Sequence, residues 1–280
     1  MPVAILGAGG MLGKDCVEIF EQTYDIVTFS KAELDITDPM AINTQLSQVV
    51  DLDVVINCAA YTNVDGAETH RDLAFLANET GPAYLAEWCG QRSVILVHFS
   101  TDYVFNGQGD TPYPETHAVA PINAYGASKL AGEMAIRAAA EQHYIFRIQW
   151  LYGQYGTHFV KTITELLRTK PQLSVVNDQI GALTWTRDIA TTVKRALQRR
   201  IPYGTYHLAA DGYASWHEVT CKIAEVLELT TPIVAVGSDT FHRPAQRPHN
   251  SRLDCNKLWK TGVSKIPRWD EQLSHFLQLI

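Results

Sequence analysis

The sequence predicts an α/β protein with a Rossmann-type, doubly wound parallel sheet and a smaller C-terminal lobe. Short β-branched runs alternate with helical patterns through the first 150 residues, which indicates parallel βαβ units. A glycine cluster lies between the first of these runs and the first helical pattern. Beyond residue 150 the alternation loosens and prolines interrupt the short elements.

Strands are predicted at residues 3–6, 25–29, 54–58, 94–99 and 144–148. Helices are predicted between them, among others at residues 39–50, 73–91 and 125–141. In a doubly wound sheet, ligands bind beyond the C-terminal ends of the strands. The glycine cluster, residues 59–62 and residues 100–102 all follow strands, so we expect these three segments to meet at one crevice.

The glycine cluster consists of Gly7, Gly10 and Gly13, a spacing variant of the dinucleotide-binding fingerprint. Glycine permits the tight turn and lets backbone N–H groups approach a pyrophosphate at the positive end of the next helix. A turn of this kind can also serve only to pack a helix on a strand. Its position near the N-terminus favours nucleotide binding.

Residues 1–150 are therefore expected to form an NAD(P)-binding domain, and residues 151–280 to form mainly a substrate-binding lobe. Prolines break the short elements of this second part: Pro171, Pro202, Pro232, Pro244 and Pro248. Because no low-complexity linker separates the parts, we expect them to be interleaved, with a soft boundary.

Composition argues against several classes of function. The formal net charge of −7 disfavours a general nucleic-acid binder. No apolar run reaches the roughly 18 residues of a membrane span, and the first residues lack the charges of a signal peptide. We therefore expect a cytoplasmic protein without membrane or nucleic-acid partners. Five scattered cysteines, with no Cys-x-x-Cys pair, indicate neither a zinc site nor a disulfide framework.

The most informative pair is Tyr125 and Lys129, which lie four residues apart in a helical pattern and hence on one face. A free tyrosine has a pKa of about 10, and a nearby ammonium favours the phenolate. The two residues are therefore a candidate acid–base pair. Taken alone, the same spacing also occurs by chance, with the tyrosine as a helix-start aromatic and the lysine as a solvated charge.

Further motifs follow one another along nearly the whole chain: Gly7 to Gly13, Asn57-Cys-Ala-Ala-Tyr-Thr62, Ser100-Thr-Asp-Tyr-Val-Phe105, Tyr125-Gly-Ala-Ser-Lys-Leu-Ala-Gly-Glu133, Val176-Asn-Asp-Gln-Ile-Gly181 and Arg247-Pro-His-Asn-Ser-Arg-Leu253. Together they resemble the dTDP-4-dehydrorhamnose reductases, which are extended short-chain dehydrogenase/reductases. The resemblance implies NAD(P)H-dependent reduction of the C4 ketone of dTDP-4-dehydro-L-rhamnose to dTDP-L-rhamnose.

The same resemblance implies that Thr101, Tyr125 and Lys129 are the catalytic residues. Tyr125 would donate a proton to the oxygen on which charge develops, and Thr101 would position that oxygen. Lys129 would favour the phenolate left behind and hydrogen-bond the nicotinamide ribose. Each of the three has an ordinary structural interpretation, but their joint occurrence with the glycine turn favours catalysis.

For the cofactor, the resemblance implies a site made of the following residues: Gly7, Gly10, Met11, Leu12, Gly13, Asp35, Ile36, Ala60, Tyr61, Thr62, Phe99, Tyr125 and Lys129. The end of the second strand carries Ser30 and Lys31 where NAD enzymes usually place an acid. A hydroxyl and an ammonium accommodate a 2′-phosphate, so we expect NADPH, with NADH as the alternative. The alternative interpretation is that Lys31 points into solvent.

For the dTDP-sugar substrate, the resemblance implies binding by Thr101, Asp102, Tyr103, Trp150 and Arg247. Asp102 would accept hydrogen bonds from sugar hydroxyls, and Trp150 would present a flat face to an apolar sugar edge. Arg247, with Arg252 as a second candidate, would bind the diphosphate. The alternatives are an Asx turn for Asp102, core packing for Trp150 and an ordinary surface position for Arg252.

Two departures from the family pattern bear on the site. Gly181-Ala-Leu-Thr184 replaces the common Gly-Ala-Pro-Thr and precedes the bulky Trp185, so the local turn is expected to differ. Some members bind a divalent cation at a dimer interface, and a homodimer is possible here. Asp15 suits such a site, but Arg187 would oppose a metal, so none is expected. We expect a core hydrogen bond for His98, beside the strand end.

Two alternatives stay open from the sequence. A 4-ketoreductase acting on another nucleotide 6-deoxy sugar would use the same residues, because facial selectivity depends on the shape of the pocket. The beta subunit of methionine adenosyltransferase also resembles these reductases and serves as a regulatory partner. The intact set of Thr101, Tyr125 and Lys129 argues against a regulatory role.

Overall fold

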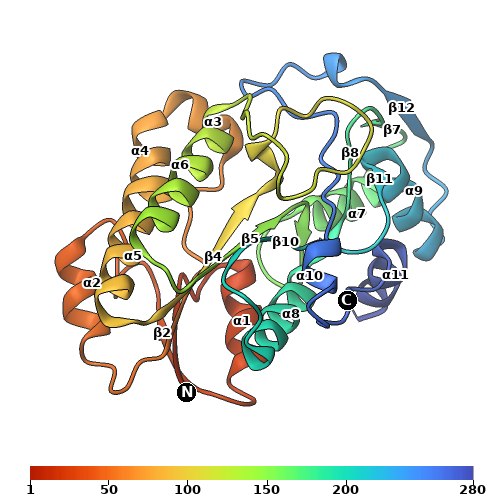
Figure 1. Cartoon of the computed structure of the whole chain (residues 1–280). Helices are drawn as coiled ribbons and strands as arrows, with labels where there is room; N and C mark the ends of the chain where they lie inside the picture. Colours follow the sequence, from red (N-terminus) through yellow and green to blue (C-terminus); the bar gives the residue numbers. More distant parts are fainter. Residues whose placement is uncertain (280) are drawn as a thin grey trace.

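The computed structural model describes residues 1–279. Its centre is a sheet of six parallel strands in the order β10-β5-β4-β3-β1-β2 (Figure 1). The strands are β1 (Pro2–Leu6), β2 (Asp25–Phe29), β3 (Val54–Asn57), β4 (Ile95–Thr101), β5 (His143–Ile148) and β10 (Gly204–His207). The chain builds outward from β1 in both directions, which is the predicted doubly wound arrangement.

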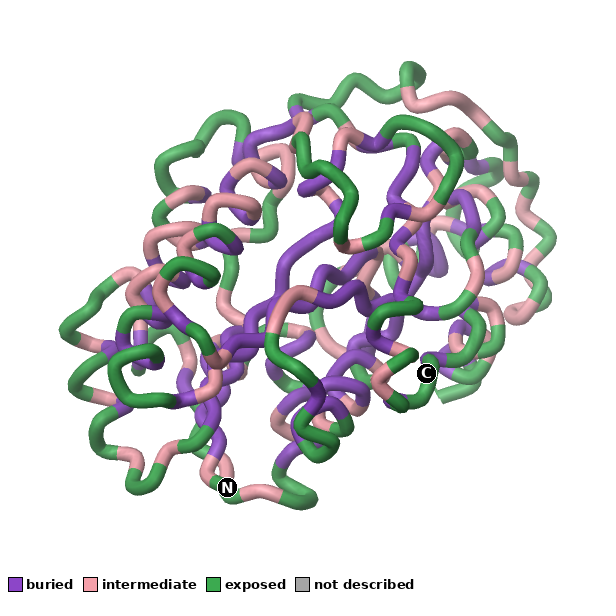
Figure 2. Tube along the Cα trace, viewed as in Figure 1, coloured by how far each residue is buried: buried purple, intermediate pink, exposed green. Residues whose placement is uncertain are grey.

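Helices cover both faces of the sheet. They are α1 (Met11–Phe20), α2 (Pro39–Leu46), α5 (Gly81–Arg92), α6 (Ala124–Ala139) and α8 (Thr186–Arg199). Successive strand residues point to opposite faces, so Val3 and Ile5 pack with α1 and α8, while Ala4 and Leu6 pack with α2, α5 and α6. The central strands β1, β3, β4 and β5 are accordingly buried along most of their length, whereas the edge strand β2 is largely exposed (Figure 2).

The C-terminal part of the chain contributes to this sheet as well as to a smaller lobe. β10 lies outside the predicted strands and pairs in parallel with β5, and α8 packs against α1. The remaining elements are β6 (Leu151–Tyr152), α7 (Phe159–Thr169), β7 (Leu173–Val176), β8 (Ile180–Gly181), β9 (Thr184–Trp185), β11 (Ala214–Ser215), α9 (Trp216–Val226), β12 (Ile233–Val236), α10 (Asn256–Trp259) and α11 (Trp269–Leu279). Among residues 1–279, no helix combines the length and apolarity needed to cross a membrane.

Two of the predicted helices were wrong in extent. The helix predicted at residues 73–91 is divided into α4 (Arg71–Phe75), a π-helical turn η1 (Leu76–Thr80) and α5. The wider turn brings Asn78 into the interior, where its amide bonds both backbone groups of Tyr61 and the hydroxyl of Ser128. The helix predicted at 39–50 ends at Leu46, because hydrogen bonds to the third preceding residue replace the α-helical pattern there.

A buried ion pair attaches α6 to the sheet. Arg147 of β5 donates to both carboxylate oxygens of Glu133, at 2.8 and 2.7 Å, and the Ser100 hydroxyl of β4 donates to the same carboxylate at 2.5 Å. Glu133 and Arg147 have side chains that are 0% and 3% exposed. Both carboxylate oxygens of Glu133 therefore have hydrogen-bond donors, and these donors come from two strands. The contact thus determines how α6 is placed along β4 and β5.

We predict that Glu133→Gln destabilises the protein by about 3–5 kcal/mol, because it leaves the buried Arg147 cation without its counter-charge. Denaturant unfolding of the variant measures the loss. Glu141→Gln is the matched control at an exposed position, where a change within about 0.5 kcal/mol is expected. Equal stability of the two variants would contradict this account of how α6 is attached.

Candidate active site

The glycine turn between β1 and α1 is closely packed against its own backbone and the next strand end. Gly7 has a φ of 69°, and a Cβ placed on it would lie 2.7 Å from the backbone nitrogen of Ala59. A Cβ on Gly13 would collide with the carbonyl oxygen of Gly7. The turn therefore requires glycine at these two positions.

The N-terminus of α1 is suited to an anion. Gly10 is its N-cap and offers no side-chain cap, and the first turn, which includes Met11 and Leu12, contains no acidic residue. Backbone N–H groups at this end carry the positive end of the helix dipole. The turn and helix therefore fit the pyrophosphate of a dinucleotide.

The end of β2 carries carboxylates as well as the expected Lys31 cation. Lys31 is exposed, and its Nζ lies 3.8 Å from Asp35 Oδ2, while Asp35 also accepts two hydrogen bonds from Thr37. Glu33, which belongs to none of the sequence motifs, accepts a hydrogen bond from Ser30 N–H at 2.7 Å. That backbone hydrogen bond lowers the pKa of Glu33, so a second carboxylate stands beside the expected 2′-phosphate position.

The segment after β3 and the C-terminal half of β4 differ in exposure. Ala60 and Thr62 are exposed, and Tyr61 is held by Asn78 through hydrogen bonds of 2.9 and 3.0 Å. Phe99 is instead buried in the core on the α1 side of the sheet, where its ring lies 6.4 Å from that of Phe146. Ile36, in the loop after β2, is also buried, and its side chain packs against Gly81, the first residue of α5.

Polar side chains gather at the end of β4. The Thr101 hydroxyl donates to Asp102 Oδ1 at 2.9 Å and accepts from Tyr103 N–H at 3.2 Å. Asp102 is 3% exposed, and burial raises its pKa to about 6. Its Oδ2 atom is buried without a hydrogen-bond partner among residues 1–279. A hydrogen bond from the Ser251 side chain lowers the same pKa, so Ser251 lies within reach of this carboxylate.

Tyr125 begins α6 beside these residues. Its ring meets the ring of Tyr103 edge to face, with centroids 5.8 Å apart. Burial and the charge of Asp102 raise the pKa of Tyr125, and the Thr101 hydroxyl acts in the opposite direction. The phenol is therefore protonated at neutral pH, which is the form that a proton donor needs.

Lys129 lies on α6 four residues after Tyr125 and is 2% exposed. Its Nζ atom lies 3.2 Å from His98 Nε2, so the lysine contacts the histidine of β4 instead of extending to the surface. Burial lowers the pKa of Lys129 to about 8, while the charge of Glu133 raises it. The sequence placed His98 in the core but gave no sign of this contact.

A cavity of about 790 Å³ lies in the C-terminal lobe and extends to Tyr103, just after the end of β4. Tyr103 and Arg247 line it from one side, and Trp216 and Phe159 supply aromatic surface. Trp150 stacks on Trp216 with ring centroids 3.6 Å apart, and its φ of 46° is unusual for a residue with a side chain. Trp150, which was expected to contact the substrate, thus packs behind Trp216 and does not line the cavity itself. Arg252 does not line the cavity either, and its guanidinium donates to Asn250 Oδ1.

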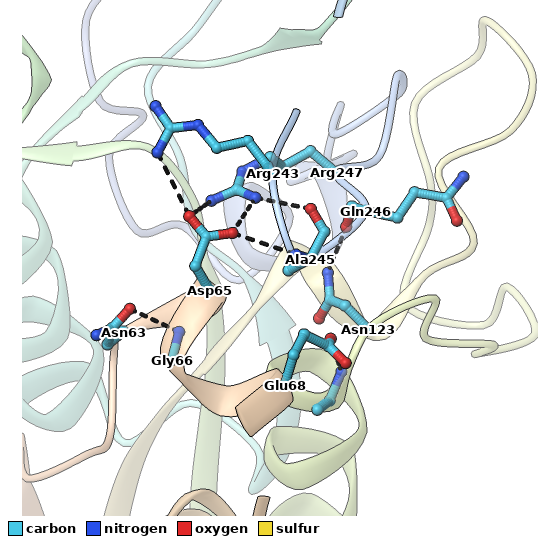
Figure 3. Close-up of polar contacts among 10 residues, drawn as sticks. Asn63, Asp65, Gly66, Glu68, Asn123, Arg243, Ala245, Gln246 and Arg247 are labelled. Carbon is cyan, nitrogen blue, oxygen red and sulfur yellow. Dashed lines mark hydrogen bonds and ion pairs between the residues drawn. The ribbon is translucent and has the colours of Figure 1, made fainter. Parts of the chain in front are cut away.

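Arg247 is held by a carboxylate that sequence reasoning missed. Asp65 lies at the start of α3 (Val64–Thr69). Its two carboxylate oxygens accept hydrogen bonds from the two terminal nitrogens of Arg247, at 2.6 and 2.9 Å (Figure 3). Asp65 also accepts from Ala245 N–H at 3.2 Å and from Arg243 at 3.4 Å. These contacts lower the pKa of Asp65, with the Arg247 hydrogen bonds as the main cause. The α3 segment and the segment around Arg247 are thereby joined across the site.

The region around Asp15 does not suit a metal. Asp15 is 2% exposed and accepts a short hydrogen bond from Thr186, and Arg187 pairs with Glu18 at 3.6 Å. Within residues 1–279, no group of three or more His, Cys, Asp or Glu residues is arranged to hold a metal ion. Trp185 packs with Tyr152 and Phe276, so the bulky residue after Thr184 lies in the core.

These features match a known family. Residues 1–280 match the family described as RmlD substrate binding domain. The chain belongs to this family. It is 38% identical over 228 residues to the dTDP-4-dehydrorhamnose reductase of Salmonella typhimurium, covering 78% of this chain and 76% of that protein. It is 37% identical over 272 residues to a probable dTDP-4,6-dihydroxy-2-methyloxan-3-one 4-ketoreductase of Streptomyces antibioticus, covering 96% and 92%.

The fold agrees with the same family. A crystal structure of dTDP-4-dehydrorhamnose reductase from Bacillus anthracis, in complex with NADP, matches with a TM-score of 0.95 and 38% identity. The match covers 100% of this chain and 99% of that one. The resemblance to the dTDP-4-dehydrorhamnose reductases and the predicted α/β fold are thus confirmed.

We predict that Gly13→Ala weakens binding of a nicotinamide dinucleotide by about tenfold or more, because the new Cβ displaces the Gly7 carbonyl and opens the turn. Fluorescence titration of the purified variant measures this affinity. Gly9→Ala is the matched control, since a Cβ there has no neighbour within 4 Å. Unchanged binding in the Gly13→Ala variant would argue that the turn does not hold the cofactor.

Proposed function

We propose that this protein reduces the C4 ketone of dTDP-4-dehydro-L-rhamnose to dTDP-L-rhamnose with NADPH. The observation that carries the proposal is that Tyr125 lies beside Thr101 at the end of β4, with Lys129 one turn later on the same helix. When bound, the nicotinamide supplies the hydride for the carbonyl carbon. The glycine turn fits its pyrophosphate, and Ser30 and Lys31 stand at the position for the adenosine ribose.

Tyr125 is the proton donor in this proposal. Its raised pKa keeps the phenol protonated, and it gives its proton to the ketone oxygen as negative charge develops there. The Thr101 hydroxyl, at the end of β4, positions the same oxygen. The phenolate that remains needs a cation, which Lys129 supplies when its side chain turns toward Tyr125.

The cavity in the C-terminal lobe supports a nucleotide-sugar substrate. Its volume of about 790 Å³ is in the range of small-molecule sites, and its aromatic lining suits a flat base. Arg247 presents a guanidinium to the cavity for a diphosphate, and Asp65 orients it. Asp102, at the end of β4, is the proposed acceptor for a sugar hydroxyl.

We further propose a division of labour along the chain. Residues 1–150 hold the cofactor, and residues 151–280 mainly hold the substrate, although β10 and α8 also complete the sheet. We expect the enzyme to act in the cytoplasm, where its nucleotide cofactor is available.

The direct test follows NADPH absorbance with purified protein and enzymatically generated dTDP-4-dehydro-L-rhamnose. We predict turnover to dTDP-L-rhamnose, and a loss of about 10²- to 10⁴-fold in kcat for Tyr125→Phe, because the phenolic proton is removed. NADPH should still bind to the variant, because only the phenolic oxygen is removed from the cofactor site. Full activity of Tyr125→Phe would contradict the assigned proton donor, and folded wild-type protein that binds NADPH without turnover would contradict the substrate.

The cofactor preference has its own test at the end of β2. We predict that Lys31→Ala weakens NADPH binding by up to about fivefold and leaves NADH binding unchanged, since an exposed ion pair contributes up to about 1 kcal/mol. Glu33→Gln should shift the preference the other way, because its carboxylate repels a 2′-phosphate. Titration with both cofactors measures the ratio. An unaltered NADPH:NADH ratio in both variants would contradict the assigned phosphate position.

A second candidate is reduction of a different nucleotide 4-keto sugar. It is favoured by the extensive match to the Streptomyces antibioticus protein, whose name indicates another 4-ketoreductase. The same active-site residues serve both reactions, so a panel of dTDP-4-keto sugars distinguishes them. The regulatory alternative predicts partner binding that survives Tyr125→Phe and no turnover with any sugar.

A further inference from the structure

A chain of buried polar contacts lies next to the proposed catalytic residues. It runs from Asn57, the last residue of β3, through His98 of β4 to Lys129 of α6, which are 1%, 0% and 2% exposed. Asn57 Nδ2 lies 3.2 Å from His98 Nδ1, and His98 Nε2 lies 3.2 Å from Lys129 Nζ. The proposed reaction uses only the lysine, so the other two side chains need a separate explanation.

The backbone decides which atoms carry hydrogens here. Ala59 N–H donates to Asn57 Oδ1 at 3.0 Å, so the amide nitrogen of Asn57 is the atom that faces the imidazole. Because that nitrogen is a donor, His98 Nδ1 must accept. A neutral imidazole then carries its single hydrogen on Nε2. The contacts therefore hold His98 as the Nε2–H tautomer.

This tautomer selects one form of Lys129. The Nε2–H group faces Nζ, and an ammonium has three donors and no acceptor, whereas a neutral amine has a lone pair that can accept. Only the neutral amine makes a hydrogen bond in this position. Burial acts in the same direction, since it lowers the pKa of Lys129 to about 8 and also lowers the pKa of His98.

The charged groups around Lys129 do not oppose this selection strongly. Glu133, on the same helix, favours the ammonium, but both of its carboxylate oxygens already accept hydrogen bonds from Arg147 of β5. Ser100 of β4 and Arg137 of α6 are further partners of that carboxylate. On the imidazole side, Lys129 itself is the only charged group among residues 1–279 that affects the pKa of His98.

We propose that His98, fixed in its tautomer by Asn57, is a positioning residue that retains Lys129 while it is a neutral amine and releases it toward Tyr125 when it is protonated. Protonation replaces the hydrogen bond with two donors that face each other, so the ammonium leaves the imidazole. Tyr125 lies one turn nearer the N-terminus of α6, which is the direction in which helical side chains lean. The released cation is then the one that the Tyr125 phenolate requires.

The proposal rests on the catalytic assignment of Lys129, but its first test needs neither substrate nor cofactor. Nitrogen-15 NMR of the histidine rings in the free protein reads the tautomer of each neutral imidazole, and the His98→Gln spectrum assigns the His98 signals. His143 is an internal reference for the opposite tautomer, because its Nδ1 lies 2.6 Å from the carbonyl oxygen of Ala140 and must donate.

The expected result is an Nε2–H tautomer for His98 at pH 7 to 9 and a titration midpoint for Lys129 near pH 8, read from its labelled amine. An Nδ1–H tautomer, an imidazolium at His98, or a Lys129 midpoint at the ordinary value of about 10.4 would overturn the proposal. These readings come from the wild-type protein, and the His98→Gln variant serves only to assign the His98 signals.

Asn57→Asp provides the second test, because a carboxylate accepts from both Ala59 N–H and His98 Nδ1. The tautomer should invert, and Nε2 should then retain the ammonium, which raises the Lys129 midpoint by about one pH unit or more. In an active enzyme kcat should fall, because the charged lysine stays at His98. An unchanged tautomer and midpoint in the folded variant would overturn the proposal. Absence of turnover in the wild type, with the NMR results as expected, would instead contradict only the proposed function.

Discussion

The ion pair between Glu133 and Arg147 determines where the site residues lie. Burying two charges is costly unless each finds all its partners, and the carboxylate of Glu133 meets this condition only where α6 faces both β4 and β5. This placement brings Tyr125 beside the end of β4 and Lys129 beside His98. A helix shifted by one turn would lose the ion pair and both contacts together.

Close backbone approach completes this arrangement. A Cβ on Gly126 would collide with the Tyr103 carbonyl oxygen, and one on Gly132 would collide with that of Asn78. The helix can therefore lie directly against the end of β4 and against the π-helical turn that holds Tyr61. The strand end, the loop after β3 and the proposed catalytic helix consequently form one packed unit, to which the Asp65 and Arg247 pair connects the C-terminal lobe.

Much of the fold could be predicted from the sequence because apolar β-branched runs mark buried parallel strands. The strand β10 was not predicted, because Gly204-Thr-Tyr-His207 is short and half polar. It is recognised only by its pairing with β5. The π-helical turn at residues 76–80 also escaped, because one wider turn leaves the helical pattern almost unchanged. Side-chain partners were the least predictable: Asp65 and Arg247 are distant in the sequence, and nothing local distinguishes His98 from an ordinary core histidine.

The central claim is that the protein reduces the sugar ketone at C4, with hydride from the nicotinamide and a proton from Tyr125. The most direct measurement uses NADPH that carries deuterium at the transferable position, with dTDP-4-dehydro-L-rhamnose as substrate and NMR of the product. The account predicts dTDP-L-rhamnose with deuterium on C4 of the sugar. Folded protein that binds the labelled cofactor, yet transfers no deuterium to the sugar, would contradict it.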